Sequence, residues 1–252
     1  MLPLVLALVG IVATSLLAAA AIAAGALTFP AGAVATVFGG IIVVFVGYPF
    51  LALLILFVAA SALATRFRFD EKRNRKVQEG RAGERGISNV LAHILIPTAL
   101  ALAAGWDPPL LGSGAVAVLY TSALAFGASD TFASEFGVLA GRARSILTFR
   151  PVTPGTNGGV SGIGEAFAFA GAATTGLVGI GLFALFGSPV HPPDIFLAAA
   201  VLAGFLGCQV DSVLGELFEN RGWLTKGGTN FLGMLGAVAI AAAFYVAAGG
   251  TL

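Results

Sequence analysis

Residues 31–65 read AGAVATVFGGIIVVFVGYPFLALLILFVAASALAT and carry no charged side chain. As one α-helix this stretch would extend ~52 Å, whereas the hydrocarbon core of a bilayer is ~30 Å thick. Pro49 follows Gly47 and Tyr48, and proline interrupts a helix because it lacks an amide hydrogen. The stretch is therefore predicted to form two short spans, 31–47 and 49–65. A single span here would change only the side on which the N-terminus lies.

The rest of the chain has the same apolar character. Of its 252 residues, 58% are hydrophobic and 10% are charged, whereas soluble domains are about 25% charged. This composition excludes a disordered chain and almost any soluble enzyme, and the single Cys208 excludes an internal disulfide or a cysteine-based zinc site. We predict one all-α domain over 1–252, a polytopic transmembrane helical bundle of about eight spans. These are 2–27, 31–47, 49–65, 87–104, 110–127, 160–187, 195–212 and 229–248.

The basic residues predict the orientation of this bundle. All 13 lysines and arginines fall in the loops 66–86, 128–159 and 213–228, whereas the connections 105–109 and 188–194 carry none. By the positive-inside rule the three basic loops are cytoplasmic, and eight spans then place both termini outside. A net charge of +1 predicts no nucleic-acid partner. We expect a multi-pass protein of a prokaryotic cell membrane that contacts membrane lipids. Both a monomer and a homo-oligomer are compatible with the sequence.

Two stretches at the ends of spans resemble each other. DTFASEF at 130–136 and DSVLGEL at 211–217 share an aspartate, a hydroxyl residue and a glutamate at the same spacing. A Gly-Thr-Asn follows each of them, at 155–157 and at 228–230. We interpret the pattern as a parallel internal repeat of a helix pair. Such repeats occur in transporters, so the repeat alone does not separate an enzyme from a carrier.

The repeated motifs combine anion-binding turns with carboxylates. Glycine and asparagine allow positive φ, so that successive amides converge on an anion, and a helix N-terminus attracts phosphate. A carboxylate at the end of an apolar span is costly and marks a partner or a function. Carboxylates among other oxygens suit Mg²⁺, which keeps waters and substrate phosphates as ligands. The pattern predicts a magnesium-nucleotide or magnesium-diphosphate site, facing the cytoplasm.

The candidate residues follow from these chemistries. The predicted magnesium ligands, which are also catalytic candidates, are Asp130, Asp211, Glu135 and Glu216. The predicted phosphate-binding residues are Gly155, Thr156, Asn157, Gly158, Gly159, Ser161, Asn89, Thr229, Asn230 and Ser134. The candidates for charge neutralisation are Arg85, Lys226 and Arg150. A tight turn and a helix cap would explain one Gly-Thr-Asn alone, but its recurrence beside an acidic motif favours a ligand site. The sequence contains no P-loop, no nucleophile elbow and no His-Glu-x-x-His.

Three of these motifs resemble a known family. SDTFASEFG at 129–137, PGTNGGVS at 154–161 and DSVLG at 211–215 are similar to motifs of the integral-membrane family called domain of unknown function 92. That family includes transmembrane protein 19 and the plastid phytyl-phosphate kinase. The resemblance covers roughly residues 20–248. Phe132 stands where the family has tryptophan, and Ser88, Asn89 and His93 depart from its usual residues.

The resemblance implies a function. The family is similar to dolichol kinases and phosphatidate cytidylyltransferases, which use CTP, so it implies nucleotide-dependent phosphoryl transfer to a lipid phosphate. We expect a polyprenyl-monophosphate kinase that transfers the γ-phosphoryl of CTP or another nucleoside triphosphate, with Mg²⁺, to an isoprenyl phosphate of phytyl or geranylgeranyl type. The lipid phosphate is already ionised, so positioning and charge neutralisation suffice without a strong base. The alternatives are a cytidylyltransferase, which would release diphosphate, and a carrier for lipid phosphates or anions.

Overall fold

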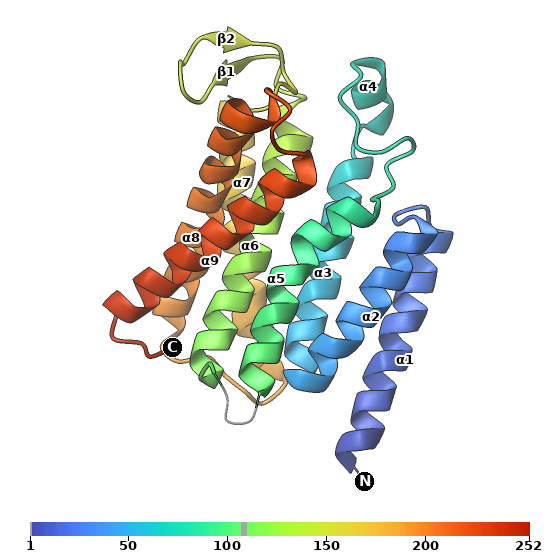
Figure 1. Cartoon of the computed structure of the whole chain (residues 1–252), viewed down its shortest axis with the longest axis vertical. Coiled ribbons are helices and arrows are strands. Elements are labelled where there is room, and N and C mark those ends of the chain that lie inside the picture. The colour runs from blue at the N-terminus through green and yellow to red at the C-terminus, as the bar shows by residue number, and fades with distance from the viewer. Residues whose placement is uncertain (1, 107–109) are drawn as a thin grey trace.

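Eight long helices form the body of the computed structural model, which describes residues 2–106 and 110–252 (Figure 1). Most of them pack side by side as a bundle, with α6 near its centre. The helices are α1 (Leu2–Ala23), α2 (Phe29–Phe45), α3 (Tyr48–Arg66), α5 (Ile87–Gly105), α6 (Ser113–Gly137), α7 (Gly162–Leu185), α8 (Pro193–Leu214) and α9 (Lys226–Ala247). The predicted all-α polytopic fold is confirmed.

The short elements gather at one end of the bundle, which we call the polar end. It holds α4 (Phe69–Asn74), the π-helical turn η1 (Gly215–Glu219) and a small antiparallel sheet of β1 (Ala143–Ser145), β2 (Pro151–Val152) and β3 (Gly159–Val160), in the order β2-β1-β3. Figure 1 shows both chain termini toward the opposite end. The three predicted basic loops therefore share one end, as the charge pattern requires. Residues 107–109 of the predicted connection 105–109 lie outside the described residues.

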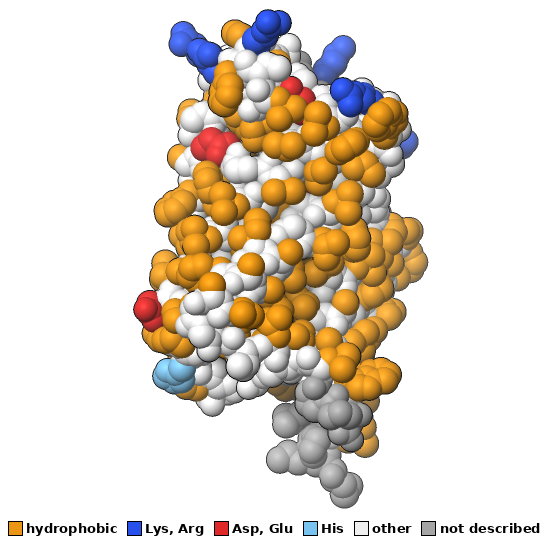
Figure 2. All heavy atoms as spheres, turned by 60° about the vertical axis from the view of Figure 1, so that its left-hand side comes forward, with side chains coloured by type: hydrophobic (Ala, Val, Ile, Leu, Met, Phe, Trp, Pro, Cys, Tyr) orange, Lys and Arg blue, Asp and Glu red, His pale blue; other side chains and the backbone are white. Residues whose placement is uncertain are grey.

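The helices have the length and composition of membrane spans. Within the described residues, six helices are long and apolar enough to cross a membrane, namely α3 and α5 to α9. Ala7–Ala23 of α1 and Phe29–Phe45 form two shorter apolar helices. Hydrophobic side chains cover the flank of the bundle, and Lys and Arg side chains gather at the polar end (Figure 2). The molecule is a multi-pass integral membrane protein.

The predicted break within 31–65 is confirmed. Helix α2 ends at Phe45 and α3 begins at Tyr48. Between them Gly47 has a φ of 91°, a backbone conformation that a side chain would strain. Pro49 lies in the first turn of α3, where its missing amide hydrogen leaves no helical bond unmade.

Helix α6 continues ten residues beyond the predicted span end at 127. The sequence SDTFASEFG looks polar enough for a loop, but its side chains are satisfied by neighbouring helices. Ser129 Oγ donates to the Ala168 carbonyl at 2.7 Å. Close packing accompanies this bond, since a Cβ added at Gly171 would lie 2.9 Å from the backbone of Ala128. As a result Asp130 is held inside the bundle at the polar end, not in a loop.

The two copies of the predicted repeat differ in structure. In the first, the acidic motif lies in α6 and Gly155-Thr156-Asn157 lies between β2 and β3. In the second, Asp211 lies in α8, Glu216 lies in η1, and the Gly-Thr-Asn lies within the first two turns of α9. The repeat therefore stays a prediction from the sequence.

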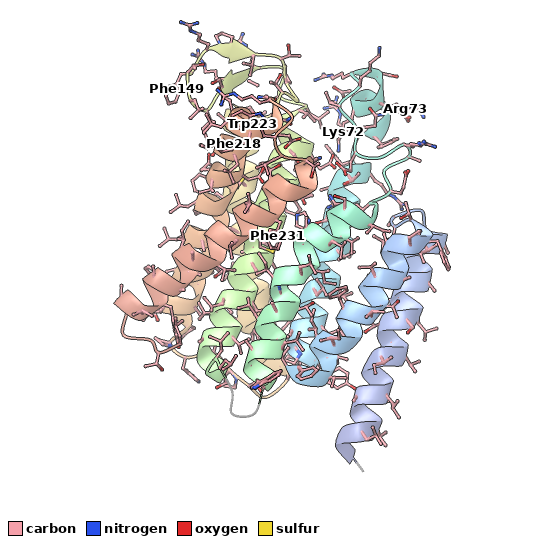
Figure 3. All side chains as sticks on the ribbon, in the orientation of Figure 1. Lys72, Arg73, Phe149, Phe218, Trp223 and Phe231 are labelled. Carbon is pink, nitrogen blue, oxygen red and sulfur yellow. The ribbon has the colours of Figure 1, made fainter. Side chains whose placement is uncertain are left out.

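Aromatic side chains mark the surface of the polar end (Figure 3). Phe149 and Trp223 are exposed there, and the Arg221 guanidinium lies 5.5 Å from the centre of the Trp223 ring. Exposed aromatic and basic side chains together are typical of the layer where lipid headgroups meet water. We therefore expect the polar end to lie near the edge of the bilayer.

Candidate functional site

A polar pocket of about 330 Å³ lies at the polar end. Its walls come from the ends of α6 and α8, the start of α9, the loop 76–79 and the turn 154–161. Segments that are far apart in the sequence therefore meet around one cavity. Most of the predicted site residues line it. They are Asp130, Ser134, Glu135, Gly155, Thr156, Asn157, Gly158, Gly159, Ser161, Asp211, Lys226 and Asn230.

Two aspartates face this pocket from different helices. Asn230 Nδ2 donates to Asp130 Oδ2 at 3.4 Å. Asp211 Oδ1 is buried, and no hydrogen-bond partner for it lies among the residues described. One turn after Asn230, a Cβ added at Gly233 would lie 3.0 Å from the Asp211 Cβ. The start of α9 thus packs against both aspartates, and the close approach to Asp211 requires a glycine at position 233.

The donor set of the pocket fits a hard divalent cation. A buried carboxylate oxygen without a partner carries a large desolvation cost, which a cation would offset. Within residues 2–106 and 110–252, no three Asp, Glu, His or Cys side chains lie close enough together to hold a metal ion by themselves. An ion on Asp130 and Asp211 would take its other ligands from water and from a bound phosphate, as Mg²⁺ characteristically does.

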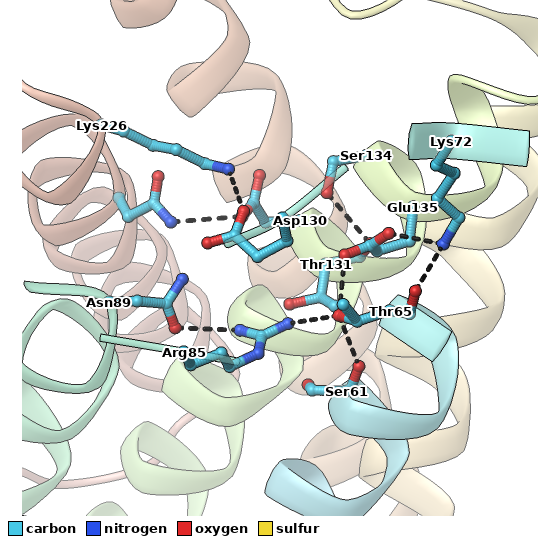
Figure 4. Close-up of polar contacts among 12 residues, drawn as sticks. Ser61, Thr65, Lys72, Arg85, Asn89, Asp130, Thr131, Ser134, Glu135 and Lys226 are labelled. Carbon is cyan, nitrogen blue, oxygen red and sulfur yellow. Dashed lines mark hydrogen bonds and ion pairs between the residues drawn. The ribbon is translucent and has the colours of Figure 1, made fainter. Parts of the chain in front are cut away.

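Glu135 has protein partners on both carboxylate oxygens (Figure 4). Lys72 Nζ lies 2.6 Å from its Oε2, and Thr65 Oγ1 donates to its Oε1 at 2.7 Å. The Lys72 side chain is fully buried, and its Nζ also donates to the carbonyls of Ala64 and Thr65 at the end of α3. Glu135 therefore joins α3, α4 and α6. Both oxygens that the predicted magnesium role would use are bound to protein partners in this arrangement.

Glu216, like Glu135, accepts hydrogen bonds that connect separate elements. Ser145 Oγ donates to Glu216 Oε1 at 2.6 Å, and the Leu147 amide donates to Oε2 at 3.4 Å. These bonds tie η1 to β1, beside the pocket instead of in it. Of the four predicted magnesium ligands, Asp130 and Asp211 thus line the pocket without an ion pair or hydrogen bond from the described residues on both carboxylate oxygens.

The predicted anion-binding turn is held tightly against its surroundings. Gly155 and Gly158 have φ values of 92° and 78°. A Cβ added at Gly155 would lie 2.7 Å from Val77 Cγ1, and one at Gly158 would lie 2.4 Å from Glu216 Cβ. Both positions require glycine for backbone conformation and for space. The turn therefore forms a fixed wall of the pocket with Thr156 and Asn157 on its lining.

Lys226 is paired with an acidic residue that the sequence reasoning missed. Its Nζ donates to Glu79 Oε2 at 2.7 Å. Burial by itself raises the pKa of the Glu79 carboxyl, but the charge and hydrogen bond of Lys226 together with the charge of Arg85 oppose it, and the pKa lies below its ordinary value. Glu79 belongs to the long basic loop, where no local pattern distinguishes it from solvated charges. Only the fold brings it to the start of α9.

Arg85 and Asn89 lie apart from the polar pocket's lining. Arg85 Nη1 donates to Asn89 Oδ1 at 3.0 Å, and Nη2 donates to Thr65 Oγ1 at 3.4 Å. Burial lowers the pKa of the Arg85 guanidinium, and the carboxylates of Glu79, Glu135 and Asp130 oppose that effect. Because arginine stays charged in proteins, this is a buried cation close to the acidic pocket. Both residues line a second, apolar cavity instead.

Two further predicted residues also lie outside the pocket. Thr229 is buried and its Oγ1 donates to Glu219 Oε2 at 2.7 Å, which fixes the connection between η1 and α9. Arg150 is exposed next to β2 and is not part of the pocket lining. Neither position supports the predicted phosphate contact in this arrangement.

The chain matches the family described as Integral membrane protein DUF92 over residues 12–235. It is 33% identical over 201 residues to an uncharacterized membrane protein of Methanocaldococcus jannaschii, covering 78% of this chain and 76% of the relative. It is 34% identical over 238 residues to an uncharacterized membrane protein of Synechocystis sp., covering 90% and 88%. Protein PGR of Arabidopsis thaliana is 33% identical over 195 residues, covering 70% and 67%. No solved structure matches. The chain therefore belongs to the DUF92 family of integral membrane proteins.

Proposed function

We propose that this protein is a membrane-embedded polyprenyl-monophosphate kinase. It transfers the γ-phosphoryl group of CTP or another nucleoside triphosphate to an isoprenyl phosphate of phytyl or geranylgeranyl type, which gives the isoprenyl diphosphate. The observation that carries the proposal is the polar pocket, in which Asp130 and Asp211, a fixed glycine turn and Lys226 meet at the end of a membrane bundle. Carboxylates, an anion-binding turn and a cation are what a magnesium nucleotide requires.

The transfer needs positioning more than proton chemistry. An oxygen of the lipid phosphate forms a bond to the γ-phosphorus while the bond to the β,γ-bridging oxygen breaks, and the nucleoside diphosphate leaves. The attacking oxygen is already ionised, so no residue has to remove a proton. Mg²⁺, when bound, neutralises charge on the nucleotide phosphates. Asp130 and Asp211 would hold it, the turn at 155–159 would hold the phosphates, and Lys226 would move from Glu79 to the nucleotide.

The basic residues support a cytoplasmic location for the site. They gather at the polar end, and the positive-inside rule assigns that end to the cytoplasm. We extend the proposal to a prokaryotic cell membrane, with each half of a parallel repeat contributing one aspartate. Nucleoside triphosphates are then supplied from the side on which the pocket lies.

A turnover assay on purified protein tests the proposal. The protein in detergent receives γ-labelled CTP, Mg²⁺ and short prenyl monophosphates, and the lipid fraction is counted. Label is expected there only when Mg²⁺ and prenyl phosphate are both present, with CDP released. Asp130→Asn is expected to lose at least a hundredfold in rate, whereas Asp194→Asn, an exposed aspartate outside the pocket lining, retains it.

Other products would contradict the kinase. Release of diphosphate with the nucleotide attached to the lipid would identify a cytidylyltransferase. No turnover, with lipid phosphate carried across a vesicle membrane, would identify a carrier. A folded Asp130→Asn variant with full activity would contradict the assignment of Asp130 as a magnesium ligand.

A further inference from the structure

A second cavity of about 430 Å³ lies between α1, α2, α3 and α5. Its lining is apolar over most of its depth, with Ala18, Leu54, Phe57 and Ile94 among the residues that form it. Helix α1 packs mainly against α2, and α2 packs against α5, which leaves space between α1 and α3. The exposed side chains of Leu17 and Leu63 also line the cavity. The cavity therefore opens on the flank of the bundle, from which a lipid can enter sideways.

Polar groups lie at one end of this apolar cavity. Arg66 ends α3, and Arg85 and Asn89 lie at the start of α5, so this is the end next to the polar pocket. The Arg85 side chain is buried, and its Nε has no hydrogen-bond partner within the described part of the chain. A buried guanidinium nitrogen left unpaired on the wall of a cavity is expected to have a ligand as its partner.

Arg85 links the two cavities. Its Nη2 bonds Thr65, which donates to Glu135, and Glu135 lines the polar pocket. Figure 4 shows Arg85 and Asn89 on the same side of Thr65 as Asp130. A group bound by Arg85 would therefore lie between the apolar cavity and the aspartates.

The geometry points to this apolar cavity as the binding site of the isoprenyl chain, with the lipid monophosphate held by Arg85 at its polar end. This inference rests on the proposed function, because it assigns the acceptor substrate of that reaction. The occupant is one lipid that combines an apolar chain with an anionic phosphate. The charge of Arg85 matches the phosphate, and the wall of α1, α2 and α3 matches the chain. The phosphate then lies next to a nucleotide in the polar pocket.

Photolabelling without nucleotide tests the site independently of turnover. The full-length protein in nanodiscs is incubated with a geranylgeranyl phosphate analogue that carries a diazirine on its chain, and labelled peptides are mapped by mass spectrometry. Labels are expected in α1, α2, α3 and α5, and unlabelled geranylgeranyl phosphate should displace the probe. Labels confined to the flanks of α7 to α9 would overturn the inference. Displacement by inorganic phosphate alone would show a free-phosphate site without a chain site.

Matched variants on α1 sharpen this test. Ala21 lines the cavity, whereas Ala19 is exposed on the same helix outside its lining. Ala21→Phe is expected to weaken binding of geranylgeranyl phosphate at least tenfold and binding of the shorter geranyl phosphate much less, because the ring fills the cavity. Ala19→Phe should bind both as the native protein does. Equal effects of the two substitutions would contradict a chain site here.

The head group is tested by Arg85→Gln. The variant is expected to lose at least tenfold in affinity for geranylgeranyl phosphate and to keep its affinity for the uncharged alcohol. If this variant does not fold, the comparison of Ala21→Phe with Ala19→Phe still decides the question. Labelling at the cavity without phosphoryl transfer would leave the lipid site standing and reject the kinase. Phosphoryl transfer with labels elsewhere would reject the lipid site alone.

Discussion

At the scale of single residues, the buried pair of Lys72 and Glu135 shows how the polar end is held together. The Lys72 side chain is fully buried and Glu135 is nearly so, and their charged atoms lie 2.6 Å apart. A buried pair contributes little net stability compared with apolar residues, but removal of one partner leaves a buried charge uncompensated. The pair therefore holds α4 against α3 and α6. It adds little to the free energy of unfolding, but loss of either partner is expected to destabilise the protein strongly.

We expect Lys72→Met to destabilise the protein by about 3 kcal/mol, because the buried Glu135 carboxylate would lose its partner. Unfolding of the detergent-solubilised protein, followed by circular dichroism, measures the change. The double variant Lys72→Met with Glu135→Gln should recover part of the loss, since neither charge is then buried alone. A double variant as unstable as both single variants added together would show that the two residues act independently.

The pair of Glu79 and Lys226 predicts a dependence of stability on pH. The folded-state pKa of Glu79 lies below its ordinary value of 4.5, so its contribution is complete above that value and is lost as the pH falls through the folded pKa. Because Lys226 is more than half exposed, we expect Glu79→Gln to cost less than about 1 kcal/mol at pH 7. The difference from the native protein should shrink toward zero at strongly acidic pH. Denaturant titrations at several pH values measure it, and a difference that grows with acidity would contradict the assignment.

At the scale of elements, the turn between β2 and β3 depends on its glycines. Gly158 and Gly222 both have positive φ, at 78° and 72°. A Cβ at Gly158 would lie 2.4 Å from Glu216 Cβ, whereas nothing lies within 4 Å of one at Gly222. The two positions share the backbone cost of a side chain and differ in the space available for it. They form a natural test and control.

We therefore expect Gly158→Ala to disturb the pocket and Gly222→Ala to leave it intact. Both variants should lose about 1–2 kcal/mol from the left-handed backbone conformation, and Gly158→Ala should lose more through its clash with η1. Binding of a magnesium nucleotide, measured by calorimetry, is expected to weaken at least tenfold in Gly158→Ala only. If the two variants bind equally well, the turn does not shape the nucleotide site.

The elements also show what the sequence could and could not predict. The apolar runs and Pro49 are enough to predict the helices. The motifs with Asp130, Asp211 and the glycines are enough to predict most of the polar pocket. Both predictions depend on composition and local turn chemistry, which can be read directly from the sequence. Ion pairs between residues far apart in the sequence have no local sequence signal. Lys72 is one of eight similar basic residues between 66 and 85, yet it alone meets Glu135. For the same reason the sequence does not predict the pairing of Glu79 with Lys226. The lack of a local signal also explains why α6 extends beyond the predicted span end, since its polar residues are satisfied by partners on α3, α4, α7 and α9.

At the scale of the whole molecule, alternating helices place every basic loop at one end. The polar pocket and the charged end of the apolar cavity lie at that same end. In the proposed function, a water-soluble nucleotide would enter from the aqueous side and a lipid from the flank of the bundle. The two proposed substrates would then have separate routes that meet near Arg85 and Asp130. A bundle of eight helices with its termini toward the other end provides this arrangement without any large extramembrane domain among the described residues.

The topology itself can be measured in intact bacterial cells. The buried Cys208 is replaced by alanine, and single cysteines are placed at the exposed positions Asn74 in α4 and Ser188 between α7 and α8. A membrane-impermeant maleimide added outside is expected to label Ser188→Cys at once and Asn74→Cys only after permeabilisation, because the positive-inside rule keeps the basic end in the cytoplasm. The opposite pattern would place the polar pocket outside the cell, where nucleoside triphosphates are scarce, and would argue against a kinase while leaving the lipid cavity open to a carrier. Equal labelling of both positions would mean that the chain inserts in two orientations, and neither assignment of the pocket would then stand.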